Sequence, residues 1–189
     1  MVNLKFDRVI FLDRDGVINR DSPDYIKNWD EFEFLPGSLE AIRLLAEAGN
    51  TLIVTTNQSI INRGWVPQSV LDHTHSQMRA SVADAGGRID DILFCPHRPD
   101  ENCACRKPKP GMILKAQRRY GLDLADTIMI GDSAKDILSG RNAGCGGTIL
   151  VQTGNGPTAL EELRLQGVAP DFIAADLLDA ARLILSQKS

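Results

Sequence analysis

Two short groups of acidic side chains carry the clearest chemical signal in this sequence. Asp13 and Asp15 stand two residues apart before Gly16, so in extended chain both carboxylates point the same way. Asp132 and Asp136 stand four residues apart, a spacing that places both on one face of a helix. Carboxylates gathered at one point repel one another unless a cation lies among them, and oxygen ligands suit Mg²⁺. We predict a magnesium site with Asp13, Asp15 and Asp132 as ligands.

The same residues are suited to phosphoryl transfer. Asp13 would attack phosphorus as a nucleophile and form an acyl phosphate, while Mg²⁺ neutralises the phosphate charge. Asp15 would protonate the departing alkoxide and then deprotonate the water that hydrolyses the acyl phosphate. Thr56 and Lys107 would contact the non-bridging oxygens, where electrostatic stabilisation acts. The sequence therefore predicts a magnesium-dependent phosphatase with these four catalytic residues.

Short apolar runs alternate with segments of helical period, and this alternation predicts an α/β fold. Such runs indicate a parallel sheet with helices on both faces, a doubly wound arrangement. We expect strands at 9–12, 51–55, 89–94, 127–130, 148–151 and 171–173. We expect helices at about 39–48, 67–86, 111–120 and 177–185, and one that begins near 132–136. Open parallel sheets bind ligands at the carboxyl ends of their strands, which here carry Asp13, Thr56 and Asp132.

A second cluster contains soft metal ligands. Cys95, His97, Cys103 and Cys105 fall within the segment 95–105, which is rich in proline and has no apolar pattern to pack. Three thiols and an imidazole form a standard tetrahedral zinc set, and four protein ligands make a closed, structural site. A local disulfide or coincidentally buried cysteines are the alternatives. We predict a zinc-bound loop at 95–105 that directs the cations following it toward the phosphate.

Other candidate residues are expected to be structural. His73 and His75 are two apart on a predicted helix, so both are expected to meet solvent. Cys145 is expected to pack before the fifth strand, and Trp29 and Phe32 to pack the segment after Asp13–Gly16.

Bulk properties narrow the class of protein. The chain has 189 residues, 43% of them hydrophobic, with no repeat or linker, so we expect one domain spanning 1–189. The net charge of −4 argues against a nucleic-acid partner. No apolar run approaches the roughly 20 residues needed to cross a bilayer, and residues 1–8 lack a signal-peptide pattern. We expect a cytoplasmic monomer that acts on a small molecule, without a membrane partner.

Four segments resemble the motifs of the haloacid dehalogenase superfamily: 9–16 (VIFLDRDG), 56–58 (TNQ), 106–108 (RKP) and 130–132 (IGD). Within it, residues 9–154 are similar to the D-glycero-D-manno-heptose 1,7-bisphosphate 7-phosphatases. The resemblance implies Asp13 as nucleophile, Asp15 as general acid/base, Lys107 as phosphate clamp and Asp132 as magnesium ligand. It also implies a Rossmann-like sheet without a large cap domain, zinc in the loop, and a role in making nucleotide-activated heptose for surface polysaccharide.

The resemblance extends to substrate recognition. It implies substrate roles for Asp21, Asp24, Asn57, Gln58, Ser59, Arg63 and Arg106. The two arginines could hold a second phosphate, although Asp21, Asp24 and Arg63 could equally be ordinary solvated charges. Ile60 departs from the family, which has glycine there. If that position requires a positive φ, a β-branched residue is disfavoured and the loop differs.

Three alternative functions remain open. A histidinol-phosphate phosphatase would share the acidic motif, the zinc loop and the 106–108 motif, but the stretches expected of it after the first two motifs are absent. A phospho-accepting signalling receiver would carry its aspartate after a middle strand, whereas Asp13 follows the first. A zinc-ribbon binding module is disfavoured by the negative charge and the lack of interleaved aromatic and basic residues.

Overall fold

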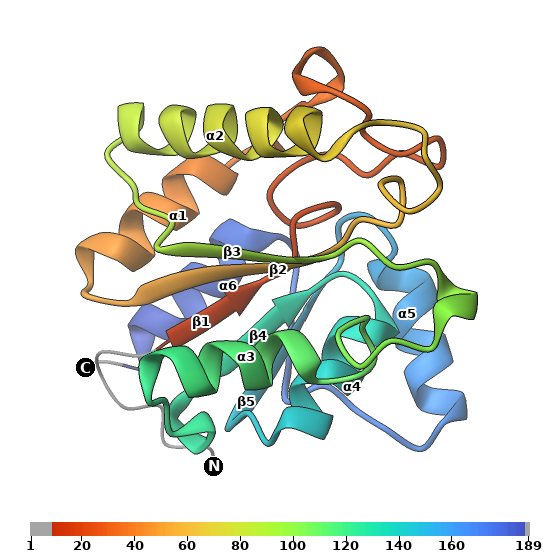
Figure 1. The fold of residues 1–189 in the computed structure, drawn as a ribbon. Coiled ribbons are helices and arrows are strands. Elements are labelled where there is room, and N and C mark those ends of the chain that lie inside the picture. The colour runs from red at the N-terminus through yellow and green to blue at the C-terminus, as the bar shows by residue number, and fades with distance from the viewer. Residues whose placement is uncertain (1–8, 188–189) are drawn as a thin grey trace.

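Residues 9–187 are described by a computed structural model, and the segment 1–8, to which the signal-peptide argument refers, lies outside the described residues. Six strands form one parallel sheet in the order β3-β2-β1-β4-β5-β6 (Figure 1). This is the Rossmann-like order, in which the chain moves outward from a central strand in both directions. The strands are β1 Val9–Leu12, β2 Thr51–Asn57, β3 Asp91–Cys95, β4 Ile128–Gly131, β5 Gly147–Val151 and β6 Phe172–Ala174.

Helices cover both faces of this sheet, as predicted (Figure 1). They are α1 Ser38–Glu47, α2 Gln68–Asp84, α3 Gly111–Tyr120, α4 Ala134–Ala143, α5 Gly156–Leu165 and α6 Leu177–Ser186. Three short 3₁₀ helices lie in the connections, at Trp29–Glu31, Pro99–Glu101 and Leu124–Asp126.

The alternation of side chains along each strand divides the core into layers. Ile10 and Leu12 of β1 point to the face covered by α1, α2 and α6, where the largest cluster of buried apolar side chains lies. Phe11, between them, points to the opposite face and packs with Met112 and Ile113 of α3. Because both faces are buried, the central strands are apolar throughout, which explains why their sequence runs are continuous.

The observed elements follow the predicted ranges closely, with one omission. Strand β1 and helix α3 have the predicted bounds, whereas β2 is two residues longer and ends at Asn57. Helix α5 was not predicted. Its start carries a usable signal, because Gly156 and Pro157 open it and proline is favoured in a first helical turn.

Irregular segments follow the carboxyl ends of β1, β2 and β3. The connection 13–37 holds only one short 3₁₀ helix and isolated bridges, so between residues 9 and 187 no large cap domain is inserted. Trp29 stacks on Phe32 at 4.9 Å and packs this connection, as expected. Within the described range, no helix is both long and apolar enough for a transmembrane span.

Candidate active site

The carboxyl ends of β1, β2 and β4 meet at one edge of the sheet, as predicted. Leu12 at the end of β1 is in register with Val54 of β2 and Ile130 of β4. The N–H of Asp13 continues this pairing by donating to the carbonyl oxygen of Ile130 at 3.0 Å. A cavity of about 190 Å³ opens at this edge. It is lined by Asp13, Asp15, Asp21, Ser22, Tyr25, Ile26, Thr56, Asn57, Gln58, Arg106, Lys107, Asp132, Ser133, Lys135 and Asn155.

Three carboxylates lie together at this edge. Oxygen atoms of Asp13, Asp132 and Asp136 are within 4.8 Å of one another. Burial and the charge of Asp136 raise the pKa of Asp132 to about 7 and hold the pKa of Asp13 well above its usual value. A divalent cation relieves such repulsion, and carboxylate oxygens are the ligands that Mg²⁺ prefers. The side chains present therefore fit a magnesium ion.

Asp136 reaches the cluster because of how α4 begins. The N–H and the hydroxyl of Ser133, the N-cap residue, donate to Asp136 Oδ2 at 3.0 and 2.6 Å. Gly131 leaves room for this side chain, since a Cβ there would lie 2.1 Å from the Cβ of Asp136. Asp132 precedes the helix, so the prediction that both aspartates share one helix face is wrong. Their carboxylates meet through the strand-to-helix turn instead.

Lys107 is buried against the nucleophile candidate. Its ammonium group lies 2.9 Å from Asp13 Oδ1 and 2.5 Å from Asp136 Oδ1, and donates to the carbonyl oxygen of Thr55 at 2.8 Å. Burial alone would lower the pKa of Lys107, but the two carboxylates outweigh it and raise the pKa above its usual value. The lysine therefore stays charged beside Asp13, where it can also meet a phosphate.

Asp15 lies apart from the metal cluster. Its carboxylate accepts from Arg14 at 2.8 to 3.1 Å, from Asn19 at 2.9 Å and from Gln58 at 2.9 Å. Burial would raise the pKa of Asp15, but the guanidinium group and the amides outweigh it and lower the pKa. The structure thus brings Asp136, rather than the Asp15 carboxylate, together with Asp13 and Asp132.

A buried histidine contacts the guanidinium group of Arg14. Arg14 is 1% exposed, and its Nη1 lies 3.2 Å from Nε2 of His75 on the inner face of α2. Burial and the charge of Arg14 lower the pKa of His75 to about 3, so the neutral ring accepts a hydrogen bond from the guanidinium group. The prediction that His75 meets solvent is wrong, because α2 covers the segment after β1. His73 is exposed, as expected.

Asn155, after β5, was not anticipated. Its backbone N–H and Nδ2 donate to Asp132 Oδ2 at 2.8 and 3.1 Å, and Nδ2 also donates to Asp21 at 3.1 Å. At Gly16, where φ is +80°, a Cβ would lie 2.1 Å from the same Asp132 oxygen. The Thr153-Gly-Asn155 turn after an apolar strand was the available signal, because it ends a strand at the same edge of the sheet.

The polar run at the end of β2 holds its neighbours in place. Asn57 Oδ1 accepts from the N–H of Lys107 at 3.1 Å, and its Nδ2 donates to the carbonyl oxygen of Lys107 at 3.3 Å. Gln58 Nε2 donates to the hydroxyl of Thr56 at 2.8 Å as well as to Asp15. Ser59 is buried, with its hydroxyl 3.4 Å from the hydroxyl of Tyr25. Asn57, Gln58 and Thr56 line the cavity, whereas Ser59 does not.

The charged substrate candidates divide into two groups. Asp21 and Arg106 line the cavity, whereas Asp24 and Arg63 are exposed and do not. The guanidinium group of Arg63 lies over the rings of Tyr25 and Trp65, at 5.8 and 5.7 Å from their centroids.

Ile60 does not disturb the loop after β2. It is fully buried, and among the described residues only Tyr25 and Asn102 combine a side chain with a positive φ. The backbone at Ile60 therefore needs no glycine, and the side chain contributes apolar burial.

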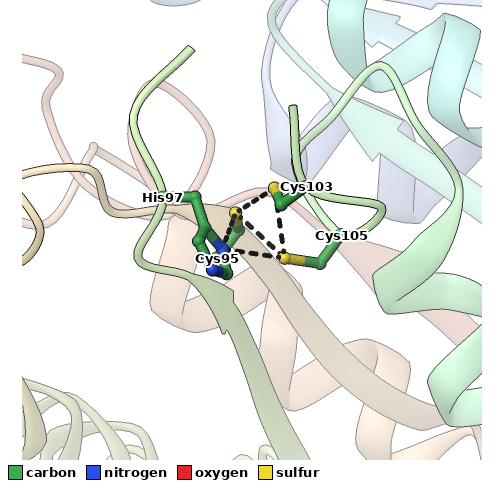
Figure 2. Close-up of side chains that lie close together, drawn as sticks. All are labelled: Cys95, His97, Cys103 and Cys105. Carbon is green, nitrogen blue, oxygen red and sulfur yellow. Dashed lines mark hydrogen bonds between the residues drawn. The ribbon is translucent and has the colours of Figure 1, made fainter. Parts of the chain in front are cut away.

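The four zinc candidates form one cluster (Figure 2). Cys95 Sγ lies 3.5 Å from Cys103 Sγ and 3.2 Å from Cys105 Sγ, and His97 Nδ1 lies 3.3 Å from Cys105 Sγ. With Zn–S bonds of ~2.3 Å, sulfur ligands at the corners of a tetrahedron stand ~3.8 Å apart. All four cysteines are free thiols, so the local disulfide is not formed, and the cluster fits zinc.

This cluster is connected directly to the catalytic edge. The N–H of Arg106 donates to Cys103 Sγ at 3.3 Å, and its guanidinium group donates to the carbonyl oxygen of His97 at 3.1 Å. Lys107 follows at once and reaches Asp13. The zinc loop therefore fixes the backbone just before Lys107, the buried cation that lies against Asp13. Cys145 is buried, as expected, and is not a member of the zinc candidate group.

Comparisons with known proteins agree with this geometry. A family model described as HAD-hydrolase-like matches residues 104–180. The chain is 43% identical over 182 residues to the D-glycero-beta-D-manno-heptose-1,7-bisphosphate 7-phosphatase of Bordetella bronchiseptica, covering 95% of this chain and 99% of the relative. It is 47% identical over 177 residues to the enzyme of that name from Pseudomonas aeruginosa, covering 94% and 97%.

A solved structure is similar over the same span. It is the D,D-heptose 1,7-bisphosphate phosphatase from B. bronchiseptica, complexed with magnesium and phosphate. The TM-score is 0.89 with 43% identity, and the match covers 95% of this chain and 99% of the other.

Proposed function

Since the chain belongs to the D-glycero-beta-D-manno-heptose-1,7-bisphosphate 7-phosphatase family of HAD-like hydrolases, we propose that it removes the 7-phosphate of D-glycero-D-manno-heptose 1,7-bisphosphate. The observation that carries this proposal is the group of Asp13, Asp132 and Asp136 carboxylates around the ammonium group of Lys107. It provides a nucleophile and an oxygen-ligand metal site at one edge of the sheet.

In the proposed reaction Asp13 is the nucleophile. One of its oxygens forms a bond to the 7-phosphorus, the bond from phosphorus to the sugar oxygen breaks, and an aspartyl phosphate results. Magnesium, held by Asp13, Asp132 and Asp136, would neutralise charge on the transferred phosphoryl group. Lys107 keeps a positive charge beside Asp13, and Thr56 offers a hydroxyl to the phosphoryl oxygens.

Asp15 is the proposed general acid and base. In the free protein Arg14, Asn19 and Gln58 favour its ionised form, which is the form that deprotonates water in the second half-reaction. An arriving phosphate dianion is a like charge that raises the pKa of Asp15, so a proton is available for the departing sugar oxygen. Water then hydrolyses the aspartyl phosphate, releasing inorganic phosphate and restoring Asp13.

Substrate recognition is assigned to side chains around the cavity. Asp21 and Arg106 line it directly and would meet the sugar hydroxyls and a phosphate. Asn57, Gln58 and Ser59 would act through the residues they hold, and Arg63 through Tyr25. Asp24, which is exposed and outside the cavity, would act only if its loop closes over a bound sugar.

The wider proposal is a cytoplasmic, monomeric, single-domain enzyme in the synthesis of nucleotide-activated heptose. A single sheet with one continuous strand order supports one domain. The Cys₃His cluster supports a reducing compartment, where thiols remain available to zinc.

The test is phosphate release in the presence of Mg²⁺ from heptose 1,7-bisphosphate and histidinol phosphate side by side. We expect strong preference for the bisphosphate, with the product identified as the 1-phosphate by ³¹P NMR, and no turnover by Asp13→Asn. Preference for histidinol phosphate would keep the chemistry and overturn the substrate. Stable phosphorylation without turnover would instead indicate a signalling receiver.

A further inference from the structure

One buried imidazole has no part in the reaction proposed above. His75 is 7% exposed and faces inward from α2 together with Leu71 and Met78. Its ring centroid lies 6.0 Å from that of Phe94, and the residue does not line the catalytic cavity. Taking a polar ring out of water is unfavourable unless a hydrogen bond replaces the lost hydration. The contact that offsets this cost is the one between Nε2 of His75 and Nη1 of Arg14, at 3.2 Å.

The guanidinium group of Arg14 connects His75 to Asp15. Its Nε and Nη2 donate to the Asp15 carboxylate at 2.8 to 3.1 Å, while its Nη1 faces His75. Arg14 is almost fully buried, so water cannot replace a lost partner of Nη1. Because the guanidinium group is planar and rigid, an acceptor that fixes Nη1 also fixes the direction in which Nε and Nη2 meet Asp15.

The same contact fixes the tautomer of His75. A guanidinium group has only donors, so Nε2 must carry a lone pair and the ring proton must lie on Nδ1. A second proton would charge the ring beside Arg14, and burial and this charge lower the pKa of His75 to about 3. Arg79 adds a like charge, whereas Asp15 acts in the opposite sense. The ring is therefore a neutral acceptor near neutral pH.

Proton transfer to a departing oxygen requires a carboxyl group held in a fixed orientation. Asn19 and Gln58 each donate to one oxygen of Asp15 at 2.9 Å. Of these partners, Arg14 alone donates to both oxygens, so it sets the plane of the carboxylate. We propose that His75 is a positioning residue for this reaction: by fixing Arg14, it sets the direction in which Asp15 meets the departing sugar oxygen. This inference rests on the proposed function.

The experiment compares two variants of His75 that differ in one acceptor. His75→Gln keeps an oxygen that can accept from Arg14, whereas His75→Leu has none. His73→Leu changes an exposed histidine of the same helix and is the matched control. Each protein is assayed with Mg²⁺ on heptose 1,7-bisphosphate, which releases a sugar alkoxide, and on 4-nitrophenyl phosphate, which releases a stable phenolate. Because kcat/KM covers the steps up to the aspartyl phosphate, it measures proton donation by Asp15 and not the later hydrolysis.

We expect His75→Leu to lower kcat/KM for the bisphosphate about 10- to 100-fold and that for the aryl phosphate less than about threefold, because only the alkoxide needs a proton. His75→Gln should keep most of the activity on the bisphosphate, and His73→Leu should keep all of it. A role in packing alone would lower kcat/KM for both substrates alike. Equal losses in His75→Leu, or no loss for either substrate, would overturn the proposal.

A spectroscopic measurement tests the contact independently of turnover and of how well a variant folds. The chain has three histidines, so the ¹⁵N resonances of the labelled imidazoles can be assigned with His73→Leu and His75→Gln. In the wild type, His75 should be neutral near neutral pH, with its proton on Nδ1. A proton on Nε2 would overturn the proposal, because this atom could not then accept from Arg14. A wild type that hydrolyses neither the bisphosphate nor histidinol phosphate would overturn the proposed function instead, which is a different result.

Discussion

The two metal-binding regions of this chain are assembled in opposite ways. The carboxylate cluster takes Asp13, Asp132 and Asp136 from segments more than a hundred residues apart, and the sheet register brings them together. The zinc cluster takes all four ligands from the segment 95–105, which has little regular structure. The fold therefore creates the first site, whereas zinc bound at the second site would order the loop that supplies its ligands.

The largest expected effect comes from removing the nucleophile. Asp13→Asn should lower kcat by about 10⁴-fold or more, because no other group can form the acyl phosphate. Without Mg²⁺ the variant should melt at a higher temperature than the wild type, since one of three mutually repelling carboxylates is gone. Phosphate release measures kcat, and calorimetry measures the melting temperature. Equal or lower melting temperatures would mean that the carboxylates do not strain the fold.

Removing one zinc ligand should shift the melting temperature in the opposite direction. Cys105→Ser should lose bound zinc, lower the melting temperature and reduce kcat/KM by about 10- to 100-fold, by displacing Arg106 and Lys107. Metal content is measured by mass spectrometry, and hydrogen exchange of residues 95–110 reports the order of the loop. Cys145→Ser removes a thiol outside the cluster and is the control. If the variant keeps full activity without zinc, the zinc loop is not needed to position Arg106 and Lys107.

The pH dependence of stability should distinguish the sites further. Because Asp132 has a pKa near 7 in the fold, this side chain binds more protons in the folded than in the unfolded state between about pH 4 and 7. Its contribution to the free energy of unfolding of the metal-free protein should therefore decrease as pH rises through this window, whereas His75, whose pKa is lowered to about 3, contributes with the opposite sign. Urea unfolding of the wild type and of Asp132→Asn at several pH values isolates the contribution of Asp132, which Mg²⁺ should reduce. A difference between the two proteins that stays constant over this range would contradict the raised pKa.

The smallest effect is expected in the loop after β2, which is held by apolar burial. Ile60→Val should destabilise the protein by about 1 kcal/mol, because one buried methylene is lost. The loss should be the same with and without added metals, in contrast to the two sites above. Urea unfolding provides the measurement, and a dependence on zinc would indicate that this loop and the zinc loop unfold together.

The sequence predicted the framework and the residue types of the site better than their contacts. Strand ends at Asp13, Thr56 and Asp132 follow from apolar runs, and the zinc ligands follow from local spacing. Pairwise contacts depend on tertiary packing, which periodicity does not encode. Asp15 therefore lies apart from the metal cluster, His75 is buried behind Arg14, and Asn155 was missed, as was helix α5.

The aromatic contacts around the cavity also give the chain built-in optical probes. Its two tryptophans lie on different loops: Trp29 stacks on Phe32, whereas Trp65 is 56% exposed with its ring edge-on to Tyr25 at 5.3 Å. Tyr25 lines the catalytic cavity and its ring contacts that of Trp65, so a ligand that displaces the Tyr25 side chain changes the surroundings of Trp65 directly. Emission from Trp65, isolated by Trp29→Phe, would follow substrate entry in real time without any added label.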